Sequence, residues 1–175
     1  KGNGGYLFDR HITRNLNQIL EQEFGNEQLT LGIMNYQVHL NYALIDSLQL
    51  DEEKIKKVAV KTLRKEEGIS YVVDMEGDSP MFVPAPIREK IINGYHRRRS
   101  GTIQIVVDPQ WYSGTPRAPG TTHGTWSPYD SHIPLVFMGW GISPGVTNQE
   151  VQIIDIAPTI AALLHIMEPN GNIGK

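Results

Sequence analysis

Between residues 29 and 108 the spacing of apolar residues alternates between the period of a strand and the period of a helix. This alternation limits the fold more than any other feature, because strands separated by helices form a sheet covered by helices. The strand-like runs are 29–34, 38–40, 70–75 and 102–108. The helix-like runs are 42–48, 51–67 and 87–93. The sequence therefore predicts a compact α/β layer, with 38–40 pairing back on 29–34 as a hairpin.

The clearest of these helices begins after Asp51, whose side chain can cap the first turn. Glu52 and Glu53 follow at the positive end of the helix dipole. Gly68 is expected to end the helix. The basic residues of KIKKVAVKTLRK fall mostly opposite the apolar stripe, which indicates a solvated surface.

Apolar segments also flank this layer on both sides. Residues 11–24 have helical spacing and precede Gly25, a residue suited to the position just past a helix end. The run 133–139, IPLVFMG, predicts a strand that is buried on both faces. Asp155 can cap a last helix, and Pro158 falls in its first turn, where a missing N–H costs little.

Composition and charge exclude several classes of protein. Hydrophobic residues make up 39% and charged residues 20%, the chain has no cysteine, and its net charge is −3. The apolar runs are too short for a membrane span, and the net charge gives no drive toward anionic membranes, so no membrane partner is expected. The acidic balance argues against nucleic acid as a partner, although the basic run Arg97–Arg99 leaves a salt-sensitive nucleic-acid binder as a minor alternative.

The segment 112–130 differs in composition, since Gly, Pro, Thr and Ser dominate it. Long loops inside compact domains often carry function, and ligand sites in α/β proteins lie outside strand ends. His123 stands in this loop, ahead of the run 133–139. Spacing alone leaves two readings open, a ligand or a loop histidine bonded to nearby backbone.

No local set of residues completes a metal or phosphate site. The six histidines include no pair at helical spacing, and the chain has neither an HExxH motif nor a glycine-rich phosphate loop with lysine. His132 is expected to be structural. His165 is expected to end the last helix and to complement its dipole.

Three segments nevertheless resemble a known family. They are GTTHGTWSPYDSHIPLVFMGWGI at 120–142, NGYHRRRSGTIQIVVDPQWY at 93–112, and DIAPTIAALLHI at 155–166, with the tail PNGNIGK. Together they resemble the alkaline phosphatase superfamily, nearest to the phosphate-irrepressible bacterial alkaline phosphatases, which are relatives of the nucleotide pyrophosphatase/phosphodiesterases.

The resemblance implies a chemistry and a role for His123. Such enzymes hydrolyse phosphate monoesters, and in some cases diesters, with two zinc ions and a phospho-enzyme formed on a threonine or serine. The histidine before the glycine of this motif is a zinc ligand, so the resemblance assigns a metal-ligand role to His123. Asp130 and His132 match no family ligand, and Asp130 is expected to orient the loop or to support a ligand.

The departures from the family pattern are as informative. The nucleophile, an Asp-His-Gly motif and an aspartate four residues before a histidine are absent here, so no catalytic residue is expected in this chain. Both ends are interpreted as boundaries inside a longer protein, and the missing partner is the N-terminal half of the same polypeptide. The fold class expected is α/β, a C-terminal fragment of an alkaline-phosphatase-like fold with a small inserted α/β subdomain.

The expected division is 1–28 in the phosphatase core, 29–112 as the small α/β subdomain, and 113–175 as the C-terminal part of the core with the metal-ligand loop. The fragment alone is expected to be inactive, and the parent enzyme is expected in the periplasm or outside the cell, as in the family. The alternative is a non-catalytic α/β interaction module that binds a partner through 112–130.

Overall fold

The computed structural model describes residues 4–77, 79–115 and 123–174. They form two compact units, with the boundary in the sequence after Ile133. The first unit is a mixed α/β structure, which confirms the predicted fold class.

Four antiparallel strands form the main sheet of the first unit, in the order β2-β3-β5-β4. They are β2 (Thr30–Met34), β3 (Gln37–Leu40), β4 (Ile69–Asp74) and β5 (Ile103–Val107). All four overlap the runs that the sequence predicted, including the hairpin, although β3 and β4 each begin one residue earlier than predicted. A parallel pair was not predicted, and consists of β1 (Gly5–Leu7) and β6 (Trp111–Ser113).

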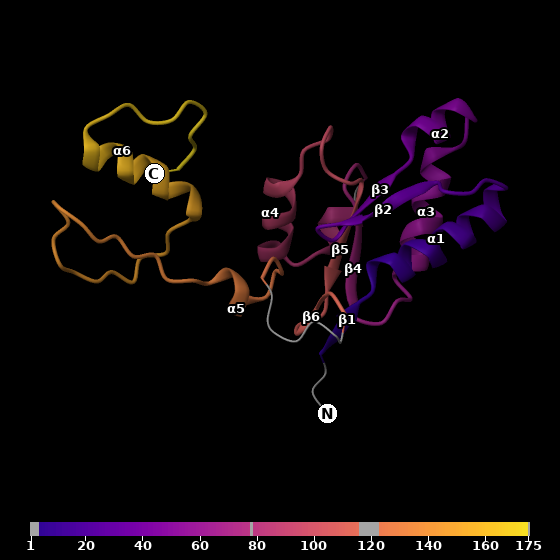
Figure 1. The fold of residues 1–175 in the computed structure, drawn as a ribbon, viewed down its shortest axis with the longest axis horizontal. Coiled ribbons are helices and arrows are strands. Elements are labelled where there is room, and N and C mark those ends of the chain that lie inside the picture. Colours follow the sequence, from indigo (N-terminus) through magenta and orange to yellow (C-terminus); the bar gives the residue numbers. More distant parts are fainter. Residues whose placement is uncertain (1–3, 78, 116–122, 175) are drawn as a thin grey trace. The chain divides into compact units, whose positions relative to one another are not determined.

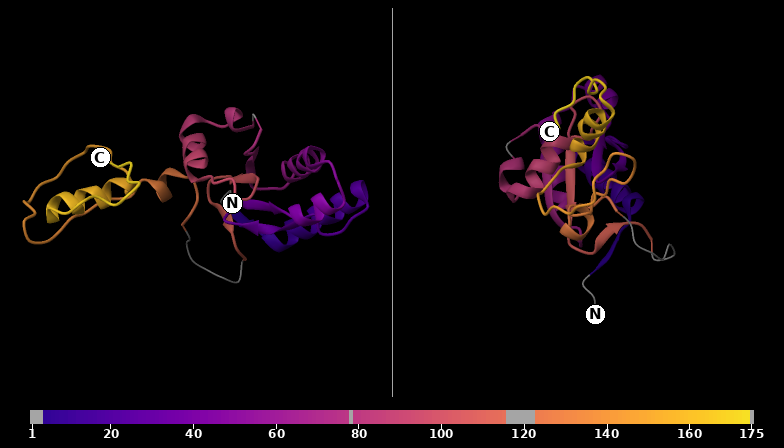
Figure 2. Two further views of the ribbon diagram at one scale, coloured as in Figure 1. Left: turned by 90° about the horizontal axis from the view of Figure 1, so that it is seen from above. Right: turned by 90° about the vertical axis from the view of Figure 1, so that its left-hand side faces the viewer.

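Helices cover both faces of the main sheet (Figure 1). They are α1 (Asp9–Phe24), α2 (Tyr42–Ser47), α3 (Glu52–Leu63), α4 (Ala85–Gly94) and the short η1 (Ser79–Phe82). α1 and α3 lie on one side of the sheet and α4 on the other, and the views in Figure 2 agree. The predicted helices are confirmed, although α3 ends at Leu63, about one turn before Gly68.

Two hydrophobic clusters follow from this layering. β4 alternates between them, since Val72 belongs to the larger cluster under α1 and α3, and Val73 belongs to the smaller one under α4. Every residue of β5 is buried. Because successive side chains of a strand point to opposite faces, a strand of this kind requires cover on both sides.

Trp111 explains why glycines stand at two distant positions. A Cβ on Gly5 would lie 2.6 Å from its ring, and a Cβ on Gly68 would lie 2.0 Å from it. Gly68 also has a φ of 83°, a conformation that costs glycine little. The indole therefore requires bare backbone both in β1 and in the connection from α3 to β4.

Lys56 departs from the expected solvated face of α3, because its side chain is only 3% exposed. Its Nζ forms ion pairs with Glu53, with Glu52 at 3.5 Å, and with Asp74 and Glu76 at 3.7 Å. Burial lowers the pKa of Lys56, but the Glu53 hydrogen bond and the surrounding negative charges outweigh burial, so the pKa is raised. This lysine therefore links α3 to the end of β4.

The second unit, described over residues 134–174, contains η2 (Ile153–Asp155) and α6 (Ile156–Leu164). Asp155 precedes α6 as predicted, although its carboxylate accepts the Gln152 N–H at 2.8 Å instead of capping α6. The predicted strand 133–139 is wrong for this chain, since these residues form no strand and all but Phe137 are exposed. A doubly buried strand needs hydrogen-bonding neighbours on its edges, and none of the described strands pairs with this run. None of the helices that the structure describes is long and apolar enough to cross a membrane.

We predict that Lys56→Met destabilises the first unit by about 2–3 kcal/mol at pH 7, because it leaves four carboxylates facing one another. Chemical denaturation measures the loss, with Lys57→Met on the exposed side of the same helix as the control. Because folding raises the pKa of Lys56, its contribution is complete below the unfolded pKa of about 10.4 and declines as the pH rises through the folded pKa. The gap between wild type and variant should therefore narrow at strongly alkaline pH. An equal loss for Lys57→Met would contradict this assignment.

Candidate metal-ligand loop

His123 is exposed and stands at the start of the described part of the loop. Gly124 follows with a φ of 101°, so the chain turns sharply just after the imidazole. Residues 116–122 of the predicted loop lie outside the described residues. A metal ligand whose partner ligands come from another part of an enzyme must be exposed, as His123 is. Its role as a metal ligand stays a prediction.

Asp130 fixes the loop that follows His123. Its Oδ2 accepts the Thr125 N–H at 2.5 Å and the Thr125 hydroxyl at 3.0 Å, while α5 (Pro128–Ser131) holds Asp130 in place. The backbone hydrogen bond from Thr125 is the largest cause that lowers the pKa of Asp130, and the Thr125 hydroxyl, the Gly124 backbone and the charge on His123 also contribute. Asp130 thus orients the loop, one of the two roles expected for it.

Trp126 attaches the loop to the hydrophobic clusters of the first unit. Its indole meets the ring of Tyr36 edge to face, with the centroids 5.7 Å apart, and packs against both hydrophobic clusters. An aromatic pair of this geometry contributes about 0.5–1.5 kcal/mol beyond the area that it buries. Lys90 on α4 also holds this segment, because its Nζ donates a hydrogen bond to Ser131 Oγ at 2.7 Å.

Tyr36 also reaches the other side of the loop. Its hydroxyl accepts the Ser113 N–H at 3.0 Å, and the Ser113 hydroxyl donates to Asp9 at the start of α1. Burial is the main cause that raises the pKa of Tyr36; the Ser113 hydrogen bond opposes the rise, and the charges of Asp9 and Asp130 add to it. The phenol is therefore protonated at neutral pH, and its oxygen is available as an acceptor.

No periodic pattern or motif in the sequence pointed to Tyr36. Asn35 and Tyr36 join β2 to β3 with φ of 49° and 61°. Tight hairpins favour Asn-Gly at such positions, and an aromatic residue there costs about 1–2 kcal/mol. The sequence signal for Tyr36 was an Asn-Tyr pair between two strand-like runs, at a position where a hairpin turn normally has Asn-Gly.

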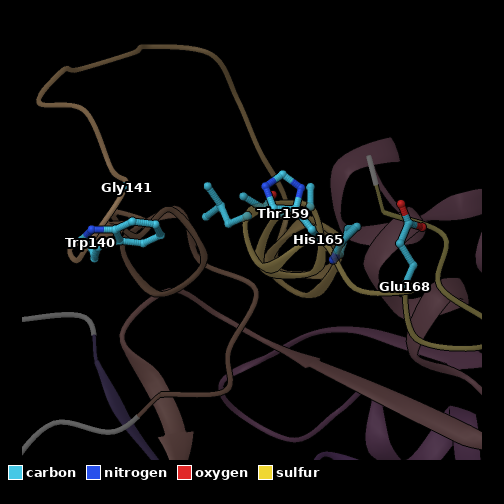
Figure 3. A pocket seen from close by; sticks show the side chains of 8 residues that line it. Trp140, Gly141, Thr159, His165 and Glu168 are labelled. Carbon is cyan, nitrogen blue, oxygen red and sulfur yellow. The ribbon is translucent and has the colours of Figure 1, made fainter.

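Within the part of the chain that the structure describes, the other histidines do not complete a site. The second unit carries an open groove in which Trp140, Thr159, His165 and Glu168 lie along α6 and the segments beside it (Figure 3). His165 ends α6 with a φ of 53°, in agreement with its expected position. Within residues 4–77, 79–115 and 123–174, no group of three His, Asp or Glu side chains could hold a metal ion.

We predict that Asp130→Ala raises hydrogen exchange at the Thr125 amide about tenfold, because this amide loses a charged acceptor. The unfolding free energy of the first unit should change by less than about 1 kcal/mol, since the carboxylate stands outside the core. Exchange followed by NMR provides the measurement, and Asp46→Ala on the exposed side of α2 is the control. An unchanged Thr125 amide would show that Asp130 does not hold the loop.

No protein-family model matches the chain. A protein named calcium-transporting ATPase from Myroides odoratus is 48% identical over 99% of the chain. Alkaline phosphatase PhoV from Synechococcus elongatus is 43% identical over 98% of the chain, and alkaline phosphatase PafA from Elizabethkingia meningoseptica is 38% identical over 97%.

The fold agrees with the sequence comparison. The crystal structure of wild-type PafA superposes with a TM-score of 0.88 at 37% identity, covering 98% of this chain and 32% of that one. A PafA variant with four substitutions gives a TM-score of 0.83 over 93% of this chain. The chain spans 30–32% of the length of these curated relatives. As the motifs predicted, the chain is similar over nearly its whole length to one segment of the alkaline phosphatases PhoV and PafA.

Proposed function

We propose that this chain is the C-terminal part of a zinc-dependent alkaline phosphatase that hydrolyses phosphate monoesters through a phospho-enzyme, with diesters as a second substrate class. The observation that carries the proposal is the match to PhoV and PafA along 98% and 97% of the chain. The loop supports it, because His123 is exposed on a segment that Asp130 and Trp126 hold in place. We place the enzyme in the periplasm or outside the cell, as its resemblance to the family implies.

Histidine is a suitable zinc ligand, but the described residues provide too few ligands for a zinc site. An imidazole is a preferred zinc ligand, but a site needs three or four protein ligands at once. The described residues offer His123 without two further donors beside it. We therefore assign His123 one position in a site whose other ligands and nucleophile come from a part of the enzyme outside this chain. When bound, the metal pair would activate the nucleophile and stabilise charge on the leaving oxygen.

The second unit supports a larger core. It exposes large apolar side chains that soluble proteins normally bury, among them Val136 at 78% and Trp140 at 101%. The run 133–139 has the composition of a central strand and no neighbour in the described sheets. We propose that the remainder of the enzyme covers this surface. The division into 1–28, 29–112 and 113–175 refers to that whole enzyme and stays a prediction.

We predict that the purified 175-residue chain with added zinc does not hydrolyse p-nitrophenyl phosphate above the buffer rate. A single histidine ligand binds zinc weakly, because affinity depends on several ligands arranged together. The release of p-nitrophenolate measures the activity. The control is the same preparation with His123→Ala, and turnover that this substitution abolishes would contradict the proposal.

In the longer enzyme we predict that His123→Ala lowers kcat/KM for a phosphate monoester by about 100-fold or more, since even the loss of a residue that supports a zinc ligand costs 10–100-fold. Zinc content per protein should fall in parallel. His132→Ala is the matched control, as an exposed histidine on the same segment that matches no ligand position of the family. The substrates tested should include a monoester, a diester and ATP, since one relative is named an ATPase.

The alternative of an interaction module makes the opposite prediction. In that case His123→Ala would leave zinc content and hydrolysis unchanged in the longer protein, and substitutions in the loop would weaken binding of a protein partner. The relation to two alkaline phosphatases favours the enzyme.

A further inference from the structure

One side chain touches the chain on both sides of His123. The Tyr36 hydroxyl accepts the Ser113 N–H at 3.0 Å, and the Tyr36 ring meets Trp126 with the centroids 5.7 Å apart. Ser113 precedes the histidine and Trp126 follows it. Tyr36 is therefore placed to restrict both ends of the segment that carries the imidazole.

The backbone of Tyr36 is held firmly in a conformation that an aromatic residue rarely adopts. Its φ is 61°, and its side chain is only 8% exposed. Its carbonyl accepts two hydrogen bonds from β5, from the Ile105 N–H at 2.7 Å and from Gln104 Nε2 at 2.9 Å. Strained residues persist where their surroundings determine them completely, and such residues gather at functional sites.

The partner ring is equally well placed. Trp126 packs against the larger cluster and also against the smaller cluster under α4. Its neighbour Thr125 donates its backbone N–H to the Asp130 carboxylate. Movement of the indole would therefore disturb the turn at Gly124 and the direction of the imidazole just before it.

We propose that Tyr36 and Trp126 form a clamp that positions the His123 loop on the sheet. Tyr36 and Trp126 are positioning residues, since they act through the loop. The significance of the clamp for catalysis rests on the proposed function, whereas the clamp itself is a property of this chain. A hairpin turn with glycine at position 36 would be less strained but could hold neither Ser113 nor Trp126.

A purely structural role for Tyr36 makes a different prediction. If the ring only fills the core, its loss would raise hydrogen exchange throughout the sheet in proportion to the loss of global stability. If it clamps the loop, the change concentrates at Ser113 and Thr125 while the amides of β4 and β5 keep their protection. Amide exchange separates the two roles without zinc or substrate.

The first test is Tyr36→Phe in the 175-residue chain, which keeps the ring and removes the acceptor. We expect exchange at the Ser113 amide to rise about five- to tenfold, with less than a twofold change in β5. Tyr71→Phe on β4 is the matched control and should leave Ser113 unchanged. Unchanged exchange at Ser113 in Tyr36→Phe, or an equal rise in β5, would overturn the clamp.

The second test is Trp126→Ala beside Trp126→Phe. We expect the alanine variant to raise exchange at Thr125 about tenfold and the phenylalanine variant to restore most of the protection, because an aromatic contact with Tyr36 remains. An unaffected Thr125 amide in Trp126→Ala, or no rescue by phenylalanine, would overturn the proposal.

In the longer enzyme, the same alanine variant should bind zinc about tenfold more weakly, as expected when the support of a ligand is lost. Loosened exchange without any change in zinc binding would leave the clamp in place and overturn its connection to the proposed phosphatase site.

Discussion

The antiparallel pairing of β5 with β3 and β4 is the interaction on which the rest of the first unit depends. β5 is buried along its whole length, so α1 and α3 must cover one face and α4 the other. The Ile105 N–H and the Gln104 side chain of β5 also donate to the Tyr36 carbonyl, which keeps the β2–β3 turn in its strained form. The position of the loop after β6 is therefore linked to β5, the strand that is buried along its whole length.

Local patterns predicted the elements of this unit because burial on a sheet or beneath a helix leaves a periodic trace in the sequence. The caps show the same locality, since Asp51 accepts the Lys54 N–H at 3.0 Å as its position implied. Long-range pairings leave no such trace. β1 and β6 are each three residues long and lie far apart in the chain, and the glycines that admit Trp111 indicate nothing until the indole is placed.

The failures have physical causes as well. Lys56 was expected on the solvated face of α3 because lysine is charged. In the structure four carboxylates take the place of water around its Nζ, and they come from α3, from β4 and from the residues just beyond β4. The run 133–139 has the composition of a central strand, yet a strand also needs neighbours, and composition does not say whether a chain provides them. His123 was found because its loop is unusual in composition and resembles a family motif. Tyr36 was missed because its importance lies in contacts with residues far away in the sequence.

These contacts bear on how a metal ligand is presented to groups from elsewhere. A ligand must be held to within about half an ångström of its working position, and regular elements hold positions better than loops do. In this chain the loop takes its order from Asp130 locally and from Tyr36 and Trp126 at longer range. The strained turn costs stability that a glycine would not cost, and the tyrosine in it both accepts the Ser113 N–H and meets an indole edge to face. A sheet that only needed to fold would not require tyrosine in that turn, which is why the proposed clamp explains the strain better than core packing alone.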